Sequence, residues 1–89
     1  MEEYEILFDP DWDKYFQKLD RSIQIRIAKT INKLGENVPA RHLKQGLPFY
    51  VTEIGQYRIC FKIDKEKKIK ILYFAGDHKD YEKWYRSTF

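Results

Sequence analysis

The chain has 89 residues, a length that fits one domain spanning residues 1–89. Its single cysteine, Cys60, rules out an internal disulfide and is read as a small buried residue rather than a catalytic thiol, as in proteins of a reducing compartment. No apolar run is long enough to cross a membrane, and the acidic start Met1-Glu2-Glu3 is unlike a signal peptide. We therefore expect a cytoplasmic location and no membrane partner.

The net charge of +3 is unevenly distributed along the sequence. Residues 1–20 hold seven acidic and two basic residues, whereas residues 21–89 hold seven acidic and fifteen basic ones. Such asymmetry is expected of a protein whose basic surface binds nucleic acid. An ordinary solvated surface fits the charge pattern equally well.

The first part of the chain predicts a strand and two helices. Residues 4–8 are apolar and aromatic, as in a strand. Asp9 and Pro10 suit the cap and first position of a helix. Its apolar stripe at helical spacing is Trp12, Tyr15, Phe16 and Leu19.

A second helix follows from Ser22 and ends at Gly35, which suits a C-terminal cap. Its apolar face is Ile23, Ile27, Ile31 and Leu34, and its opposite face carries Arg26, Lys29 and Lys33. The two helices predict a helical hairpin packed on a sheet. The basic face is read as a solvated surface in preference to a ridge that contacts RNA.

Residues 36–48 read as a connector that carries Arg41, His42 and Lys44. A long irregular segment in a small domain is often functional. His42 has no partner that the sequence indicates, so it is read as a surface residue, whereas the cations Arg41 and Lys44 are candidates to contact a nucleic-acid backbone.

Three further strands and a helix complete the prediction. The strands are residues 49–54, 57–63 and 68–75, the first two joined by a tight Gly55-Gln56 turn, and residues 80–88 form a short helix. The expected fold is α+β: an N-terminal strand and helical hairpin packed on a mainly antiparallel four-stranded sheet, with a short C-terminal helix.

Alternation of apolar residues predicts the register of the last two strands. Pairing Ile63 with Ile69 and Tyr57 with Ala75 gives one apolar face toward the helices, made of Tyr57, Ile59, Phe61, Ile63, Ile69, Ile71, Tyr73 and Ala75. In this register Arg58 lies opposite Phe74 on the other face. Since Arg58 begins its strand and His78 follows the end of the next, we expect the two side chains to share one small site.

A guanidinium, an imidazole and a phenol at one place suit phosphodiester chemistry. Arg58 can neutralise charge that builds on a phosphate, and His78 can transfer a proton near neutral pH. Tyr81 and Tyr85 can donate hydrogen bonds or stack on bases, while Lys79, Lys83 and Arg86 add phosphate contacts. The simpler alternative is that His78 and Tyr81 only cap and pack the last helix.

The sequence suggests no cofactor. It contains no set of His, Cys and carboxylate residues at ligand spacing, so we expect no metal site. With RNA as substrate, the 2′-hydroxyl beside the scissile phosphate is a built-in nucleophile.

The order and spacing of three motifs resemble the RelE/ParE superfamily of type II toxins over nearly the whole chain. The motifs are Leu43-Lys44-Gln45-Gly46, Tyr57-Arg58-Ile59-Cys60-Phe61 and Gly76-Asp77-His78-Lys79-Asp80-Tyr81, the last similar to the Gly-x-His-x-x-Tyr turn of HigB-like members. The resemblance implies an mRNA endonuclease that acts in the ribosomal A site, gives a cyclic phosphate and a free 5′-hydroxyl, and is blocked by a cognate antitoxin.

Carried over by position, the resemblance implies three catalytic residues. Arg58 would stabilise the phosphate, His78 would be base or acid, and Tyr81 would fall on the motif's tyrosine. Lys44 and Lys79 would hold RNA backbone or ribosomal RNA. Members closest to RelE itself place two lysines in the second strand, whereas this chain reads Tyr50-Val51-Thr52-Glu53 there, which leaves proton transfer to His78 and Tyr81.

Two other functions stay open on the sequence. One is a ParE-like inhibitor of DNA gyrase without nuclease activity, against which the Gly-x-His-x-x-Tyr turn argues. The other is a basic domain that binds nucleic acid or a partner protein and is not toxic.

Overall fold

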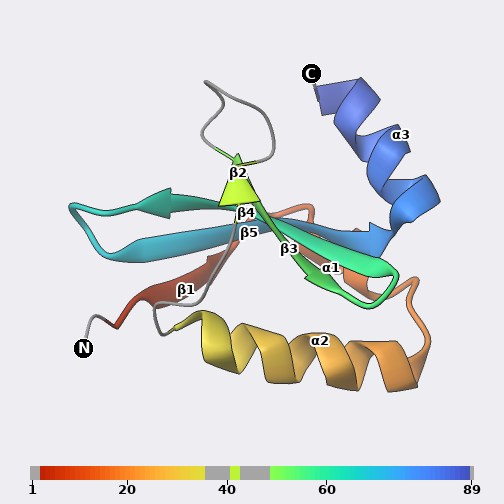
Figure 1. The fold of residues 1–89 in the computed structure, drawn as a ribbon, viewed down its shortest axis with the longest axis horizontal. Coiled ribbons are helices and arrows are strands. Elements are labelled where there is room, and N and C mark those ends of the chain that lie inside the picture. Colours follow the sequence, from red (N-terminus) through yellow and green to blue (C-terminus); the bar gives the residue numbers. More distant parts are fainter. Residues whose placement is uncertain (1–2, 36–40, 43–48, 89) are drawn as a thin grey trace.

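The computed structural model describes residues 3–35, 41–42 and 49–88, the side chains of 41 and 42 excepted. Within them the chain forms a five-stranded sheet and three helices (Figure 1). The elements in chain order are β1 (Glu5–Phe8), α1 (Trp12–Phe16), α2 (Arg21–Leu34), β2 (Arg41–His42), β3 (Phe49–Ile54), β4 (Tyr57–Asp64), β5 (Ile69–Asp77) and α3 (His78–Thr88).

The sheet has the strand order β1-β5-β4-β3-β2. β1 runs parallel to β5, and the other neighbouring pairs are antiparallel. Figure 1 shows α2 along one side of the sheet and α3 rising from the end of β5 on the other side. The α+β fold expected from the sequence is confirmed, with the short β2 added within the segment read as a connector.

Two hydrophobic clusters hold the helices against opposite faces of the sheet. The first lies under α1 and α2 and includes the buried residues Trp12, Ile27, Leu34, Ile59, Phe61, Leu72 and Ala75. The second lies under α3 and includes Phe49, Val51, Cys60, Phe74 and Trp84. Burial of each large apolar side chain stabilises the fold by about 1.5–3 kcal/mol, so both faces of the sheet contribute to the core.

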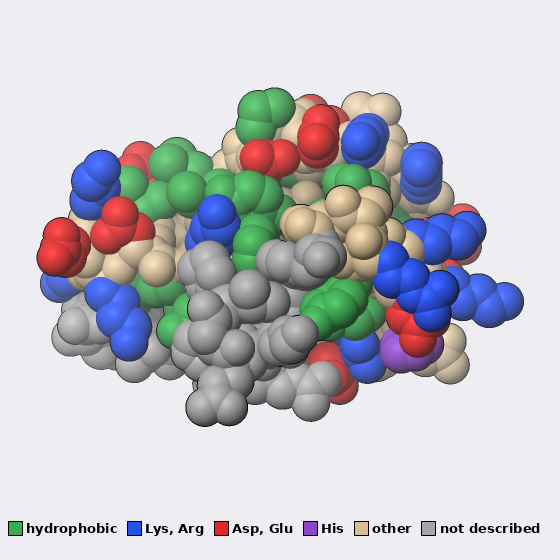
Figure 2. All heavy atoms as spheres, turned by 90° about the horizontal axis from the view of Figure 1, so that it is seen from above, with side chains coloured by type: hydrophobic (Ala, Val, Ile, Leu, Met, Phe, Trp, Pro, Cys, Tyr) green, Lys and Arg blue, Asp and Glu red, His purple; other side chains and the backbone are tan. Residues whose placement is uncertain are grey.

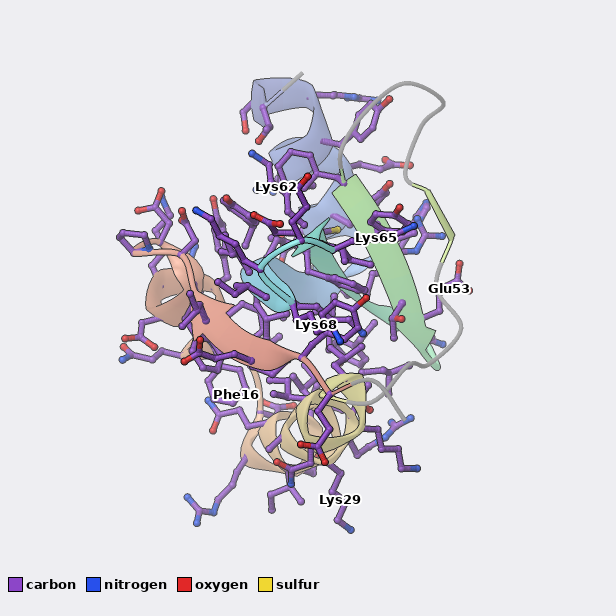
Figure 3. All side chains as sticks on the ribbon, turned by 90° about the vertical axis from the view of Figure 1, so that its left-hand side faces the viewer. Phe16, Lys29, Glu53, Lys62, Lys65 and Lys68 are labelled. Carbon is purple, nitrogen blue, oxygen red and sulfur yellow. The ribbon has the colours of Figure 1, made fainter. Side chains whose placement is uncertain are left out.

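The predicted apolar face of the second helix is confirmed. Ile27 and Leu34 are buried in the first cluster, and Ile23 and Ile31 pack against it. The opposite, basic face is exposed, and Lys29 extends from α2 away from the sheet (Figure 3). Gly35 is the C-cap, as expected, with a helical φ of −63°.

The N-terminal helical segment is shorter than predicted. α1 ends at Phe16, so Leu19 lies beyond it, although Leu19 still packs against the first cluster. The Asp9 carboxylate accepts a hydrogen bond from the backbone N–H of Asp11 at 3.0 Å, and α1 begins at Trp12. Asp9 therefore shapes the turn that leads into α1.

The predicted register between β4 and β5 is wrong. Ile59 pairs with Ala75 and Cys60 with Phe74, but Phe61 pairs with Leu72, so the register shifts at this point and Tyr73 is an extra residue on β5. Such a β-bulge breaks the two-residue alternation on which the prediction relied. Arg58 accordingly lies opposite Gly76 instead of Phe74.

The shifted register buries Lys70 on the face toward α2, with 2% of its surface exposed. Its Nζ donates a hydrogen bond of 2.8 Å to the carbonyl oxygen of Leu34, the last residue of α2, and lies 4.7 Å from the centre of the Tyr4 ring. The carbonyls of a final helical turn lack partners within the helix. Lys70 satisfies one of them, and burial lowers the pKa of its ammonium group.

In the part of the chain that the structure describes, no helix has the length and apolar character needed to span a membrane.

The lowered pKa of Lys70 predicts a specific pH dependence of stability. Above this pKa, and below the ordinary lysine value of about 10.4, the unfolded chain binds more protons than the folded one, so stability rises with pH. We expect the free energy of unfolding of the wild type to increase over this window relative to that of Lys70→Met, measured by urea denaturation. Lys65→Met, at an exposed turn position, should follow the wild type, and equal pH profiles for Lys70→Met and the wild type would contradict the burial effect.

Candidate active site

Two strand pairings and one chain connection bring Arg58 and His78 together. Arg58 on β4 pairs with Glu53 on one side and with Gly76 on the other. β5 ends at Asp77 and α3 begins at once with His78, so this side chain lies in the first turn of the helix. The prediction had placed the start of the helix two residues later, at Asp80.

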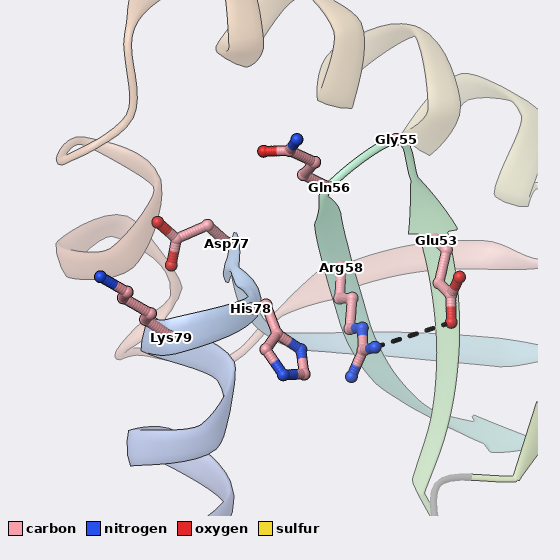
Figure 4. Close-up of a pocket in the computed structure, with 7 residues that line it drawn as sticks. All are labelled: Glu53, Gly55, Gln56, Arg58, Asp77, His78 and Lys79. Atoms are coloured by element: carbon pink, nitrogen blue, oxygen red, sulfur yellow. Dashed lines mark ion pairs between the residues drawn. The ribbon is translucent and has the colours of Figure 1, made fainter.

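Arg58 and His78 line one open pocket, as the sequence predicted (Figure 4). The pocket has a volume of about 510 Å³ and lies between the β3–β4 turn and the start of α3. Gly55 has a φ of +59° and begins the two-residue turn that forms one rim. The lining residues are Glu53, Gly55, Gln56, Arg58, Asp77, His78 and Lys79.

Arg58 is held between a carboxylate and an aromatic ring. Its Nη2 lies 4.0 Å from Oε1 of Glu53, and its Cζ lies 4.6 Å from the centre of the Tyr81 ring. The Arg58 side chain is only 23% exposed, whereas that of Glu53 is 46% exposed. Cation–π contact and partial burial fix the guanidinium while leaving donors for an anion in the pocket.

His78 has a carboxylate partner on its own helix. Nε2 of His78 lies 2.9 Å from Oε1 of Glu82, one helical turn further along α3. The Glu82 carboxylate therefore orients the imidazole ring. Figure 4 shows the imidazole beside the Arg58 guanidinium, with one ring nitrogen on that side.

Tyr81 is the third predicted catalytic residue, and the structure brings it to the same place. Its ring contacts Arg58, and its centre lies 6.4 Å from that of His78 and 6.1 Å from that of Tyr85. Burial raises the pKa of the Tyr81 phenol, while Arg58 lowers it. The net increase keeps the phenol neutral near neutral pH, so Tyr81 can donate a hydrogen bond but is a poor base.

Cys60 lies under the site in the second cluster and is fully buried. Burial raises the pKa of its thiol to about 12, although Arg58 lowers it. A thiol with this pKa is not a nucleophile at neutral pH. The prediction that Cys60 is buried is confirmed.

Asp77 has a structural partner within the site. Its Oδ1 accepts a hydrogen bond of 2.9 Å from the backbone N–H of Asp80, which satisfies a free donor in the first turn of α3. Asp77 therefore fixes the start of the helix that carries His78.

The predicted RNA-binding residues divide among three surfaces. Lys79 lines the main pocket but extends away from Arg58 (Figure 4). Tyr85 and Arg86 line an adjoining hollow of about 330 Å³, whereas Lys83 lines a separate one of about 290 Å³ with Tyr15 and Lys18. Arg41 lies in β2 but its side chain is not described, and Lys44 is outside the described residues.

The sequence interpretation missed two carboxylates of the site, Glu53 and Glu82. Glu53 lies directly opposite Arg58 across the short Gly55-Gln56 turn, a position that follows from hairpin register alone. Glu82 is four residues after His78, the spacing at which helical side chains meet. The hairpin register that pairs Glu53 with Arg58 and the four-residue spacing from His78 to Glu82 can both be seen in the sequence.

Among the described residues, no group of three His, Cys, Asp or Glu side chains is arranged to hold a metal ion.

Comparison with known proteins identifies the fold. No protein-family model matches the sequence, and no curated protein gives a significant match. The structure is similar to a chain of the RelBE2 toxin–antitoxin complex of Mycobacterium tuberculosis, with a TM-score of 0.79 and 17% identity over 88% of this chain and 94% of that one. The chain has the RelE fold.

Further solved structures share the RelE fold at similar identity. The isolated RelE toxin of E. coli matches with a TM-score of 0.69 and 17% identity, over 97% of this chain and 99% of that one. The RelE–RelB complex of Pyrococcus horikoshii matches with a TM-score of 0.68 and 16% identity, over 86% of this chain and 96% of that one. These likenesses confirm the fold expected from the sequence motifs, and at such identity they concern the fold alone.

Basic side chains gather at one end of this RelE fold. Figure 2 shows Lys and Arg side chains grouped there, close to a histidine side chain. The main pocket itself is balanced, because its two acidic residues, Glu53 and Asp77, match its two basic residues, Arg58 and Lys79. The positive charge of this region therefore lies mostly around the pocket.

The junction between β5 and α3 depends on Gly76. A methyl group there would lie 2.7 Å from Cζ of Phe74 and 3.3 Å from Cβ of Asp80. Phe74 is buried and cannot move freely. We expect Gly76→Ala to lower the free energy of unfolding by about 1–3 kcal/mol in urea denaturation, because overpacking displaces the Phe74 ring.

Gly35→Ala provides the matched control. Its added methyl group would meet only backbone oxygens at 3.5 and 3.7 Å, which are ordinary contacts. A Gly76→Ala protein as stable as Gly35→Ala would show that the junction is not tightly packed.

Proposed function

We propose that this chain is the toxin of a type II toxin–antitoxin pair and acts in the cytoplasm as an RNA endonuclease that inhibits translation by cutting mRNA. The observation that carries the proposal is the meeting of Arg58 and His78 at one open pocket, with the Tyr81 ring against the Arg58 guanidinium. The RelE fold supports it, because similar structures are RelE toxins and RelE–RelB complexes.

In the proposed reaction the 2′-hydroxyl of the RNA attacks the adjacent phosphate and displaces the 5′-oxygen. Arg58 binds the phosphate and stabilises the charge that develops on it. His78 transfers a proton, and the neutral phenol of Tyr81 donates a hydrogen bond to a phosphate oxygen. The products are a 2′,3′-cyclic phosphate and a free 5′-hydroxyl, and no metal or cofactor is needed because the RNA supplies the nucleophile.

The surface of α3 offers a path for the RNA on either side of the cleaved bond. His78, Tyr81 and Tyr85 form a line of rings with centres 6.4 and 6.1 Å apart. Aromatic rings stack on unpaired bases, and this interaction tolerates different sequences. Lys79, Lys83 and Arg86, with Arg41 and Lys44, would contact phosphates of the message or of the ribosome in its A site.

We expect Arg58→Ala and His78→Ala to relieve growth arrest when the chain is induced in cells. In single-turnover cleavage of message on ribosomes, the losses should be about 10²–10³-fold for Arg58→Ala and about 10²–10⁴-fold for His78→Ala. Lys65→Ala, at an exposed turn outside the pocket, is the control and should behave as the wild type.

The assignment is wrong if both variants fold and still cut message or arrest growth. Mapping of message ends with and without ribosomes also tests whether ribosomes are required. Growth arrest with intact message and inhibited DNA supercoiling would instead identify a ParE-like gyrase inhibitor.

A cognate antitoxin is the second part of the proposal. Neighbouring structures contain RelE bound to RelB, and the basic side chains around the pocket would attract an acidic segment that folds on binding. We expect the acidic, helix-rich product of an adjacent short gene to co-purify with the tagged chain, and to do so less well at high salt. High yields of the active chain from cells that lack this gene would contradict the prediction.

A further inference from the structure

We propose that the open edge of β1 is a docking site for an extended segment of another protein, which carries lysine or arginine side chains and adds a strand to the sheet. The site is separate from the main pocket, because no residue of Glu5–Phe8 lines that pocket. The inference therefore stands or falls independently of the proposed nuclease activity.

The backbone of β1 is paired on one side only. β1 is the outermost strand of the described sheet, and its neighbour is β5. The backbone N–H groups of Glu5 and Asp9 each donate a hydrogen bond of 2.9 Å on the β5 side. Because successive residues of a strand turn their N–H and C=O groups to alternate sides, those of Ile6 and Phe8 point away from β5. No backbone hydrogen bond joins these outward groups to another described residue.

The edge of β1 lacks the features that usually prevent strand addition. Exposed edge strands are commonly protected by lysine, proline, a β-bulge or very short length. The strand Glu5-Ile6-Leu7-Phe8 contains neither lysine nor proline, and its register with β5 is continuous. Figure 3 shows β1 at one rim of the sheet, with β3 toward the other. At that other edge of the described sheet, β2 has only two residues, so β1 is the longer template for a further strand.

Apolar side chains are exposed on both faces of this edge. Leu7 is 40% exposed and Phe8 is 51% exposed, and only one other large hydrophobic residue of the described chain is exposed. The Phe8 ring lies on the side of the helices, with its centre 5.5 Å from that of Trp12, and Leu7 faces the opposite side by alternation. A strand placed beside β1 would cover both side chains, so backbone pairing and apolar burial would act together.

The charge around the edge decides which strand fits. Residues 3–14 hold five acidic residues and one base, Lys14, whose Nζ lies 3.9 Å from Oδ2 of Asp11. Lys68 adds one cation at the start of β1, where its carbonyl oxygen accepts the bond from the Glu5 N–H. The acidic residues are Glu3, Glu5, Asp9, Asp11 and Asp13.

This acidic surplus favours a basic strand over the other occupants. Opposite charges on paired strands stabilise the pairing, and like charges weaken it. A second copy of this chain would bring two acidic edges together, so self-pairing through β1 is disfavoured. The antitoxin expected above is acidic and suits the basic side chains around the pocket instead. The partner that fits β1 is an extended segment with apolar residues for Leu7 and Phe8 and with lysine or arginine among them.

The test measures amide hydrogen exchange by NMR with and without a blocked peptide of alternating lysine and valine. We expect the peptide to slow exchange of the Ile6 and Phe8 amides about tenfold, while the Leu7 amide, which points toward β5, changes little. Phe8→Pro removes an outward N–H at an edge position that tolerates proline. By fluorescence anisotropy it should bind the peptide about tenfold more weakly than Phe8→Ala, the matched control that keeps the N–H.

The charge requirement has its own comparison. A peptide of alternating glutamate and valine should bind the wild type about tenfold more weakly than the lysine peptide, and Glu5→Lys should narrow this difference. Added salt should weaken binding of the lysine peptide to the wild type, since the flanking acids lie at the surface.

Three results would overturn the inference. Peptide binding that leaves exchange of the Ile6 and Phe8 amides unchanged would show attraction to the acidic surface without strand addition. Equal binding by Phe8→Pro and Phe8→Ala would show the same. Slow exchange of both amides without peptide, together with a dimeric mass in sedimentation, would identify a second copy as the occupant. Circular dichroism checks the fold of Phe8→Pro, and the exchange measurement on the wild type does not depend on that variant.

Discussion

The bulge at Tyr73 is the constraint on which the rest of the structure depends. By adding one residue to β5, it turns Tyr73 and Phe74 toward the same face of the sheet. Tyr73 then meets Phe49 with ring centres 5.1 Å apart, and Phe74 stacks on Trp84 at 5.3 Å. Without the bulge, two consecutive residues of a strand would face opposite sides, so Tyr73 and Phe74 could not both lie on the face that carries Trp84 of α3.

The aromatic contacts fix the helix that carries the candidate site. Trp84 is wedged between Phe49 and Phe74, and each aromatic pair contributes about 0.5–1.5 kcal/mol beyond the area it buries. Since α3 follows β5 without a loop, fixing Trp84 also fixes His78 six residues earlier. The guanidinium of Arg58, pressed on Tyr81, is aligned by the same helix. The geometry of the pocket therefore depends on the packing of Trp84 in the middle of α3.

Much of the fold follows from simple periodicity, and its failures have physical causes. Alternation located β3, β4 and β5, and helical spacing located the buried face of α2. The bulge could not be recognised from the sequence, because the extra residue, Tyr73, is aromatic and fits the apolar pattern of either face of the sheet. The burial of Lys70 could not be predicted either, because a lysine side chain normally lies in solvent. Here its hydrogen bond to the Leu34 carbonyl oxygen makes burial possible.

The part of the site that depends on chain order, Arg58 with His78, was predicted. The part that depends on pairing across strands, Glu53 with Arg58, was missed. Arg58 and His78 meet because one begins β4 and the other follows β5, and this holds in either register. Glu53 was missed because residues were judged by charge, and an acid is not expected at a site for an anion. The short hairpin turn nevertheless makes it the neighbour of Arg58.

The balance of acidic and basic residues inside the pocket affects how the pocket discriminates among anions. A pocket of uniformly basic residues would hold any phosphate and release product slowly, because the attraction is the same before and after reaction. Here acids balance bases inside the pocket, and further cations such as Arg86 and Lys83 lie outside it. Under the proposed function, affinity for the RNA chain would come from the surroundings, while Arg58 would hold the phosphate between the Glu53 carboxylate and the His78 imidazole. Under the proposed function, such a site would bind the transition state, in which charge moves across the phosphate, more tightly than it binds the substrate or the product.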